Sequence, residues 1–173
     1  MRRVVPAALF SLLSFGMLAC SPNGSGGDGG TGTTAECDGG TISLEVNAPS
    51  CLWAPDHDMV LFTLADVTAT VSGTCSLPTL KVIGVTSNQP DNGGGSGNTS
   101  PDYTFNSTGV CLRSERCGTI DTPRVYTITF EATDGNISVT KSVDVVVDHS
   151  QDGAGCSLVD SSRIVADGDP RCN

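Results

Sequence analysis

The sequence predicts an all-β fold, a sandwich of about seven strands, for the chain beyond residue 40. Apolar and β-branched residues alternate there with polar residues, which is the period of a strand. Turn-forming residues separate these segments at short intervals. No window keeps the 3.6-residue period of an amphipathic helix. These three observations favour two packed antiparallel sheets over any helical fold.

Seven segments carry the strand pattern. The sixth has an apolar face made of Tyr126, Ile128, Phe130 and Ala132. Seven strands in about 110 residues predict a sandwich of immunoglobulin type across residues 37–149, although the Cys–Trp–Cys spacing of antibody domains is absent. The segments are residues 41–46, 59–71 with a break near Ala65 and Asp66, 79–87, 103–105, 110–113, 125–133 and 136–147, where Val139, Val143, Val145 and Val147 point one way.

The order of the strands sorts the loops into two ends. Strands that run from end to end place alternate connections at the same end of a sandwich. The loops at 48–57, 89–101 and 116–123 therefore share one end with the C-terminal tail, and we call it the distal end. The short turns and the N-terminal linker share the proximal end. Loops on a rigid scaffold are where binding usually resides, so the contact site is expected at the distal end.

The first 19 residues have the pattern of a secretory signal. Arg2 and Arg3 precede an apolar run over residues 4–17, which is too short to span a bilayer as a stable helix. With Cys20 at the cut site, the segment resembles a bacterial lipoprotein signal. That resemblance implies lipidation of Cys20 and, from Ser21, sorting to the outer membrane. Plain cleavage that leaves a free Cys20 thiol is the alternative.

Residues 20–36 are rich in Gly, Ser and Thr, and predict a flexible tether. Removal of the signal leaves 154 residues with seven bases against 19 acids, a net charge of −12. Such a surface repels nucleic acid, which excludes it as a partner. It favours soluble cations, Ca²⁺ among them.

Eight Cys residues in an exported chain predict disulfides. No CxxC pair is present, so metal spacing is absent. Strand order allows Cys37–Cys75 at the proximal end. For the distal end the expected pairs are Cys156–Cys172, which would close the tail of residues 150–173, and Cys111–Cys117 beside the fifth strand. Cys51 would then be the odd thiol, and Cys51–Cys117 is the competing bridge.

Three segments resemble an immunoglobulin-like or cadherin-like domain of bacterial surface proteins. They begin at Leu52-Trp53-Ala54-Pro55-Asp56-His57, at Ser87-Asn88-Gln89-Pro90, and at Leu112-Arg113-Ser114-Glu115-Arg116, which Arg124-Val125-Tyr126-Thr127-Ile128 follows. The corresponding family segments read LWPPNHKMV, SNEP, LRAER and RVYTI. The match covers residues 51 to about 149. Ala54, Asp56 and Asp58 depart from the pattern, and Cys111 and Cys117 are additional.

The resemblance to cadherins implies calcium, because the corresponding Glu and Asp bind Ca²⁺ there. Ca²⁺ takes six to eight oxygens, several from carboxylates. Strand order brings six acidic residues of this chain to the distal end. The alternative is that Glu115 pairs with Arg113, Arg116 or Arg124 while the Asp residues shape turns. The six candidate ligands are Glu115, Asp91, Asp102, Asp56, Asp58 and Asp148.

Trp53 and His57 are the candidate binding residues of the first distal loop. Trp53 beside Pro55 suits a platform for a sugar or peptide, or else a plug over the end of the sandwich. His57 lies between two Asp residues, as a base oriented by a carboxylate would. It suits equally a turn histidine bonded to the loop backbone. No GxSxG nucleophile motif accompanies it, so no enzyme is expected.

These observations predict an envelope-anchored, non-enzymatic binding, adhesion or scaffolding module. Its expected partners are the membrane, through the lipid on Cys20, and a protein or glycan at the distal loops. A passive spacer with no ligand is the alternative, and a calcium-stabilised module is another. An exposed patch around Trp53 would favour a binding module, and a concave pocket holding His57 beside a hydrogen-bonding partner would favour an enzyme.

Overall fold

The computed structural model describes residues 34–91, 95–97, 99–148 and 156–173. In these residues the only helices are two 3-10 turns, so the predicted all-β class is confirmed. The strands are β1 (Thr34–Cys37), β2 (Gly40–Val46), β3 (Cys51–Leu52), β4 (Met59–Thr63), β5 (Val67–Ser72), β6 (Thr79–Ser87), β7 (Tyr103–Phe105), β8 (Gly109–Arg113), β9 (Arg124–Thr133), β10 (Ser138–Val147) and β11 (Ile164–Val165).

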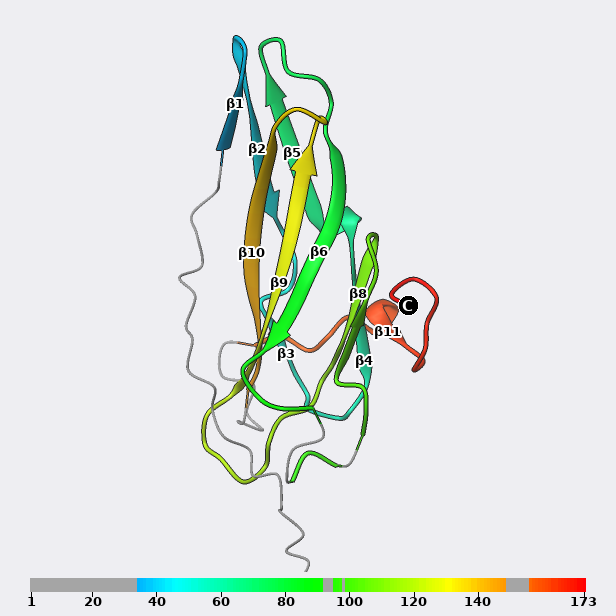
Figure 1. Cartoon of the computed structure of the whole chain (residues 1–173). Helices are drawn as coiled ribbons and strands as arrows, with labels where there is room; N and C mark the ends of the chain where they lie inside the picture. Colours follow the sequence, from blue (N-terminus) through cyan, green and yellow to red (C-terminus); the bar gives the residue numbers. More distant parts are fainter. Residues whose placement is uncertain (1–33, 92–94, 98, 149–155) are drawn as a thin grey trace, which may run out of the picture.

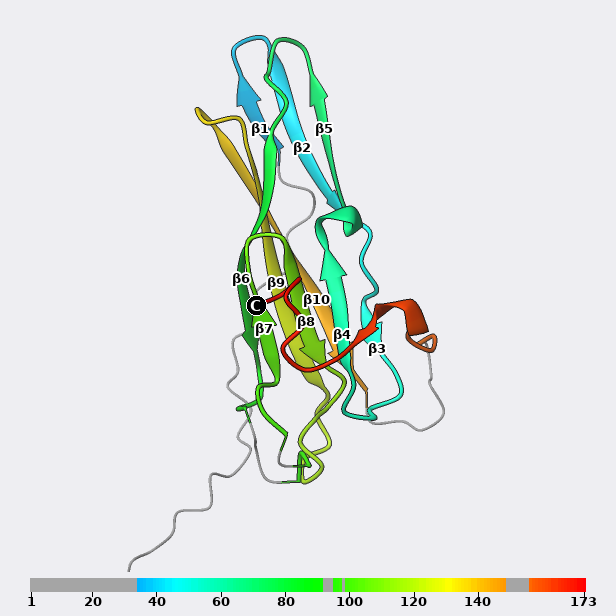
Figure 2. The same cartoon turned by 90° about the vertical axis from the view of Figure 1, so that its right-hand side faces the viewer.

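The strands form several sheets, consistent with a β-sandwich. One sheet has the order β3-β10-β9-β6 and runs most of the length of the molecule (Figure 1). The opposite layer is divided into β1-β2-β5 towards one end and β11-β4-β8-β7 towards the other (Figure 2). All neighbouring strands are antiparallel except β3, which lies parallel to β10. The three sheets thus enclose one main core.

The core follows the period-two pattern of the sequence. The predicted apolar face of β9 is buried throughout, and Val139, Val145 and Val147 of β10 are buried beside it. The strand β4 is buried on both faces, because Met59 and Leu61 pack outward against Cys111, Val165 and Cys172. A continuous apolar run is typical of such a strand.

The predicted break in the segment 59–71 lies at a 3-10 turn, Leu64–Asp66. Thr63 accepts a hydrogen bond from the Ala65 backbone, and the Asp66 carboxylate accepts one from the Thr63 backbone at 2.9 Å. This reciprocal cap ends one strand and starts the next. As a result β4 pairs with β8, whereas β5 pairs with β2.

Some elements differ from the expectation. Strand β1 starts at Thr34, so the last three residues of the predicted tether belong to a strand. The two-residue strands β3 and β11 carry no alternation that a sequence pattern can reveal. The predicted signal of residues 1–19 and Cys20 lie outside the described residues. In the described ranges no helix is long and apolar enough to cross a membrane.

The disulfides correct two of the three expected pairs. Cys37–Cys75 is confirmed. The predicted Cys156–Cys172 and Cys111–Cys117 bonds are wrong, because Cys156 joins Cys51 and Cys172 joins Cys111. Cys51 is therefore not an odd thiol, and the competing Cys51–Cys117 bridge is wrong too.

The path of the tail explains these errors. Strand order placed the whole tail at the distal end, but the tail turns back along β4 as β11 and ends beside the β7–β8 turn. There the Asn106 side chain donates to the Asn173 carbonyl at 3.1 Å. A Cβ on Gly109 would lie 2.3 Å from the Arg171 carbonyl oxygen, so only glycine allows this close approach.

Candidate binding site

The three long loops meet at one end of the molecule, as predicted. Figure 1 shows them below the sheets, opposite the β1–β2, β5–β6 and β9–β10 turns. In the structure the third loop covers residues 114–123, between β8 and β9. Backbone contacts join the loops directly: His57 donates to the Ser114 carbonyl at 3.0 Å, and Gly118 donates to the Gly95 carbonyl at 3.2 Å. The Cys117 backbone donates to the side chain of Gln89 at 2.7 Å. Each loop therefore contacts another one.

Glu115 is the buried acceptor around which the loops are arranged. Its side chain is fully buried, and its Oε2 atom lies 2.9 Å from His57 Nδ1. The same oxygen accepts a hydrogen bond from the Thr99 hydroxyl. The His57 ring remains 46% exposed and rests against Gly97, where a Cβ would lie 2.6 Å from the ring. One carboxylate thus connects three loops.

Within the described part of the chain Glu115 forms no ion pair with an arginine, contrary to the alternative considered for it. It pairs with His57 instead. The His57 ring therefore bonds a carboxylate and not the loop backbone. The three arginines have other acceptors. Arg113 donates to the carbonyls of His57 and Pro101 and to the Asp167 carboxylate. Arg116 donates to the carbonyls of Cys117 and Ile120, and Arg124 donates to the Asp102 carboxylate.

Arg124 is a buried charge beneath the loop that contains Asp102. The guanidinium donates to the Asp102 carboxylate, to the Tyr126 hydroxyl at 3.0 Å and to the Pro90 carbonyl at 3.3 Å. The Tyr126 hydroxyl in turn donates to the Arg113 carbonyl at 3.0 Å. Burial raises the pKa of Tyr126, so it stays a neutral donor. This network fixes the loop 88–102 to β8 and β9.

Burial raises the pKa of Asp102 to about 6, although Arg124 opposes the shift. The nearby charges of Asp91 and Glu115 act in the same direction as burial. Asp102 Oδ1 and Glu115 Oε1 are buried and find no hydrogen-bond partner among the residues that the structure describes. A buried polar atom without a partner costs stability. The distal end is therefore electrostatically costly and depends on the contacts that its loops make.

The six predicted calcium ligands do not gather into one cluster. Asp102 and Glu115 face protein donors, and Asp91 accepts hydrogen bonds from the Asp102 backbone at 2.7 Å and the Ser100 hydroxyl at 2.9 Å. Asp56 accepts from the Asp58 backbone. Among the described residues, no three His, Cys, Asp or Glu side chains are grouped to hold a metal. Calcium binding by this set, Asp148 included, stays a prediction.

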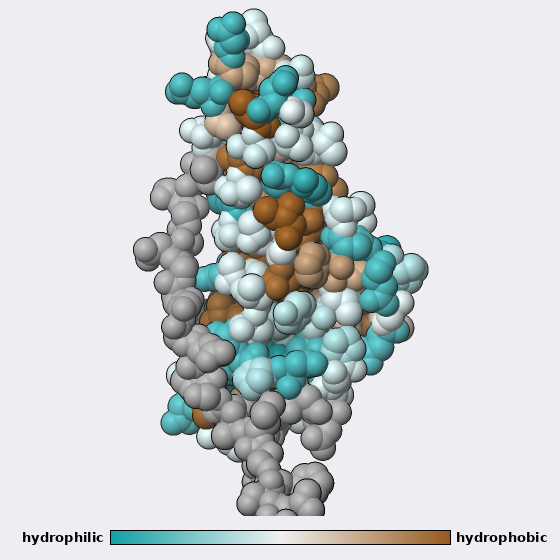
Figure 3. Space-filling view, in the orientation of Figure 1, coloured by the Kyte–Doolittle hydropathy of each residue, from teal (hydrophilic) through white to brown (hydrophobic). Residues whose placement is uncertain are grey.

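Trp53 is half-buried, between the two arrangements considered for it. Its carbonyl accepts a hydrogen bond from the Val159 backbone at 3.0 Å, which attaches the tail to the first distal loop. Of the large exposed apolar residues in the described chain, Leu158 precedes Val159 in the tail, whereas Leu77, Ile83, Phe105 and Ile164 lie on other segments. On the face in Figure 3 the apolar residues form separate patches. Trp53 thus combines partial exposure with a contact to the tail.

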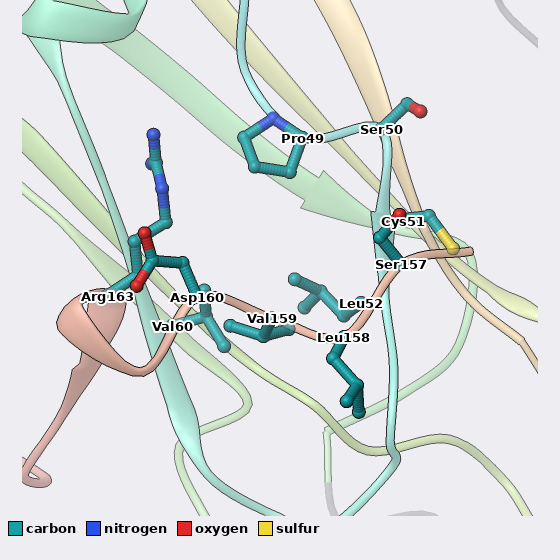
Figure 4. A pocket seen from close by; sticks show the side chains of 10 residues that line it. All are labelled: Pro49, Ser50, Cys51, Leu52, Val60, Ser157, Leu158, Val159, Asp160 and Arg163. Carbon is teal, nitrogen blue, oxygen red and sulfur yellow. The ribbon is translucent and has the colours of Figure 1, made fainter. Parts of the chain in front are cut away.

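A cavity of about 300 Å³ lies between β3, β4 and the tail (Figure 4). Sequence reasoning missed it, because the tail was expected to pack elsewhere. Leu52 and Val60 of the core contribute to its wall, and the exposed Leu158 lies at its edge. Arg163 also lines it, but Asp66 neutralises that charge, with contacts of 3.0 and 2.5 Å. The cavity is mainly apolar, with a compensated ion pair on one side.

A smaller cavity of about 180 Å³ holds the pair of His57 and Glu115. This satisfies the geometric condition stated for an enzyme, a pocket with His57 beside a hydrogen-bonding partner. The cavity is smaller than the 300–1,000 Å³ usual for ligand pockets. A histidine and a carboxylate also need a nucleophile, a water or a metal to act on a substrate. The arrangement orders loops and gives no positive indication of catalysis.

No family model, curated protein or solved structure matches the chain.

Substituting Glu115 by Ala tests its role in joining the loops. We expect the free energy of unfolding to fall by about 2–4 kcal/mol, because His57 and Thr99 lose their buried acceptor. The matched control is Glu131→Ala, which removes an acid from the partly exposed Lys81 pair on β6 and β9. That change is expected to cost less than about 1 kcal/mol. Equal losses in urea denaturation of the two variants would contradict the assigned role.

The raised pKa of Asp102 predicts an unusual pH dependence. Its folded-state pKa of about 6 exceeds the ordinary value of 3.8, so the folded state binds this proton more tightly than the unfolded chain. The contribution of Asp102 to the free energy of unfolding therefore increases as the pH falls through 6 towards 4, by on the order of 1 kcal/mol. In Asp102→Asn the increase should disappear. Thermal melting from pH 7.5 to 5 measures it, and identical profiles for both proteins would refute the assignment.

Proposed function

We propose that the protein is a non-enzymatic binding or scaffolding module of the bacterial envelope. In this proposal the β-sandwich is immunoglobulin-like, and the predicted lipid on Cys20 holds it to the outer membrane. The pattern of the first 21 residues supports the anchor. Two features support the sandwich. After β2 the chain crosses to the other layer, where β3 pairs with β10. The break within residues 59–71 lets β4 join one sheet and β5 another.

The observation that carries the proposal is the joined set of distal loops. Glu115 connects three loops, and Arg124 holds the loop 88–102 to the sheets. Loops held in one arrangement lose little entropy when a partner binds, which favours recognition. The small cavity at His57 is better suited to positioning loops than to enclosing a substrate. A protein or glycan partner at the distal end fits this arrangement best.

The proposal can be tested with a protein of residues 21–173 displayed on fluorescent beads. The beads are incubated with a glycan array and with a panel of immobilised matrix proteins. A binding module should retain at least one probe. Trp53→Ala should weaken that retention at least tenfold, because aromatic residues contribute strongly at interfaces. The matched control is Leu77→Ala, which removes an exposed apolar side chain from the β5–β6 turn at the opposite end. Retention of no probe, or equal loss in both variants, would favour a passive spacer or a different contact surface.

A further inference from the structure

Three disulfides connect the two ends of the described chain to its middle. Cys51–Cys156 spans 105 residues of sequence, and every strand from β4 to β10 lies between these two cysteines. Cys37–Cys75 joins the β1–β2 turn to the segment after β5. Cys111–Cys172 joins the end of the tail to β8. The two ends of the described chain are therefore linked covalently by routes shorter than the backbone between them.

These bonds provide two short covalent routes across the domain. The first runs from Cys37 to Cys51 and, across that disulfide, from Cys156 to Cys172, which is about 30 residues. The second crosses from Cys37 to Cys75, follows the chain to Cys111 and crosses to Cys172, which is about 36 residues. The backbone itself covers about 135 residues between Cys37 and Cys172.

The first route leaves out most of the hydrophobic core. Of the buried residues in the main cluster, only Ile42 and Leu44 lie on it, and all the others lie between Leu52 and Val147. Tension on this route can separate β2 from β5 and β11 from β4. The contact of this route with the sheet of β6, β9 and β10 is the short pairing of Cys51 with β10, where Val146 also donates to the Ser50 carbonyl at 2.9 Å.

We propose that the disulfides make this domain an almost inextensible link, in which tension between its two ends passes around the sandwich core. Non-covalent contacts at the edges can break, but the ends cannot separate by more than the shorter covalent route. The property deepens the proposed function, because an anchored module that holds a partner bears load. Its measurement requires neither partner nor lipid, so the two proposals fail independently.

Single-molecule force spectroscopy on residues 21–173, with one handle at each end, tests the inference. Without reductant, residues 37–172 should contribute no more than about 10 nm of contour length, at roughly 3.5 Å per residue. With a phosphine reductant the same residues should contribute about 45 nm. A contour length of several tens of nanometres before reduction would overturn the proposal.

The variant Cys51→Ser/Cys156→Ser tests whether the second route carries tension when the first is absent. Its contour length should rise only slightly, to about 12 nm, because the other two disulfides remain. A long extension in this variant without reductant would contradict the two-route arrangement. The comparison of reduced and oxidised wild-type protein decides the main claim even where the variant fails to fold.

Discussion

The distal end of this protein depends on charged side chains that are buried beneath its loops. Arg124 is the largest fully buried side chain in the described chain, and Glu115 is fully buried as well. A buried charge without partners is too costly to keep. The loop 88–102 supplies Arg124 with the Asp102 carboxylate and the Pro90 carbonyl, and the other loops supply Glu115 with His57 and Thr99. The contacts of these buried charges therefore hold the described residues of the loops in place.

The remainder of the fold positions this network and limits its movement. The strands β8 and β9 lie in facing sheets. Each has a buried arginine at the distal end of the molecule, Arg113 as the last residue of β8 and Arg124 as the first residue of β9. Arg113 extends the network to the tail through Asp167, and Trp53 accepts from Val159 of the same tail. The disulfides then fix both chain ends to the strands. The proposed roles in binding and in bearing load rest on the same rigidity.

The sequence predicted the parts of this structure that depend on local patterns. Alternation is a property of neighbouring residues, so β6 and β7 were predicted with their observed bounds and β9 within one residue. Strand order then predicted which loops meet. The disulfides depend on the path of an irregular tail, for which no period exists. Two of their pairs were therefore predicted wrongly, and the cavity under the tail was missed.

The candidate site was predicted in its location but not in its chemistry. Glu115, His57 and Asp102 were all singled out, and the structure brings Glu115 and His57 together. Their expected roles assumed accessible carboxylates, because acidic residues are usually exposed. The signal that was available is the alternation of β9, which places Arg124 on the same face as Tyr126 and Ile128. If the alternation of the predicted strand 125–133 is continued by one residue towards the N-terminus, it predicts that Arg124 is buried and that its partners are buried too.

Amide hydrogen exchange over residues 113–118 measures the central claim most directly. If the buried charges order the loops, the backbone amides of Ser114, Glu115 and Cys117 exchange slowly, as do those of β9, because each donates within the network. Gly118 should exchange slowly through its bond to Gly95. Exchange of these amides at the rate of an unstructured chain, with β9 still protected, would show that the loops are not held by the charges beneath them.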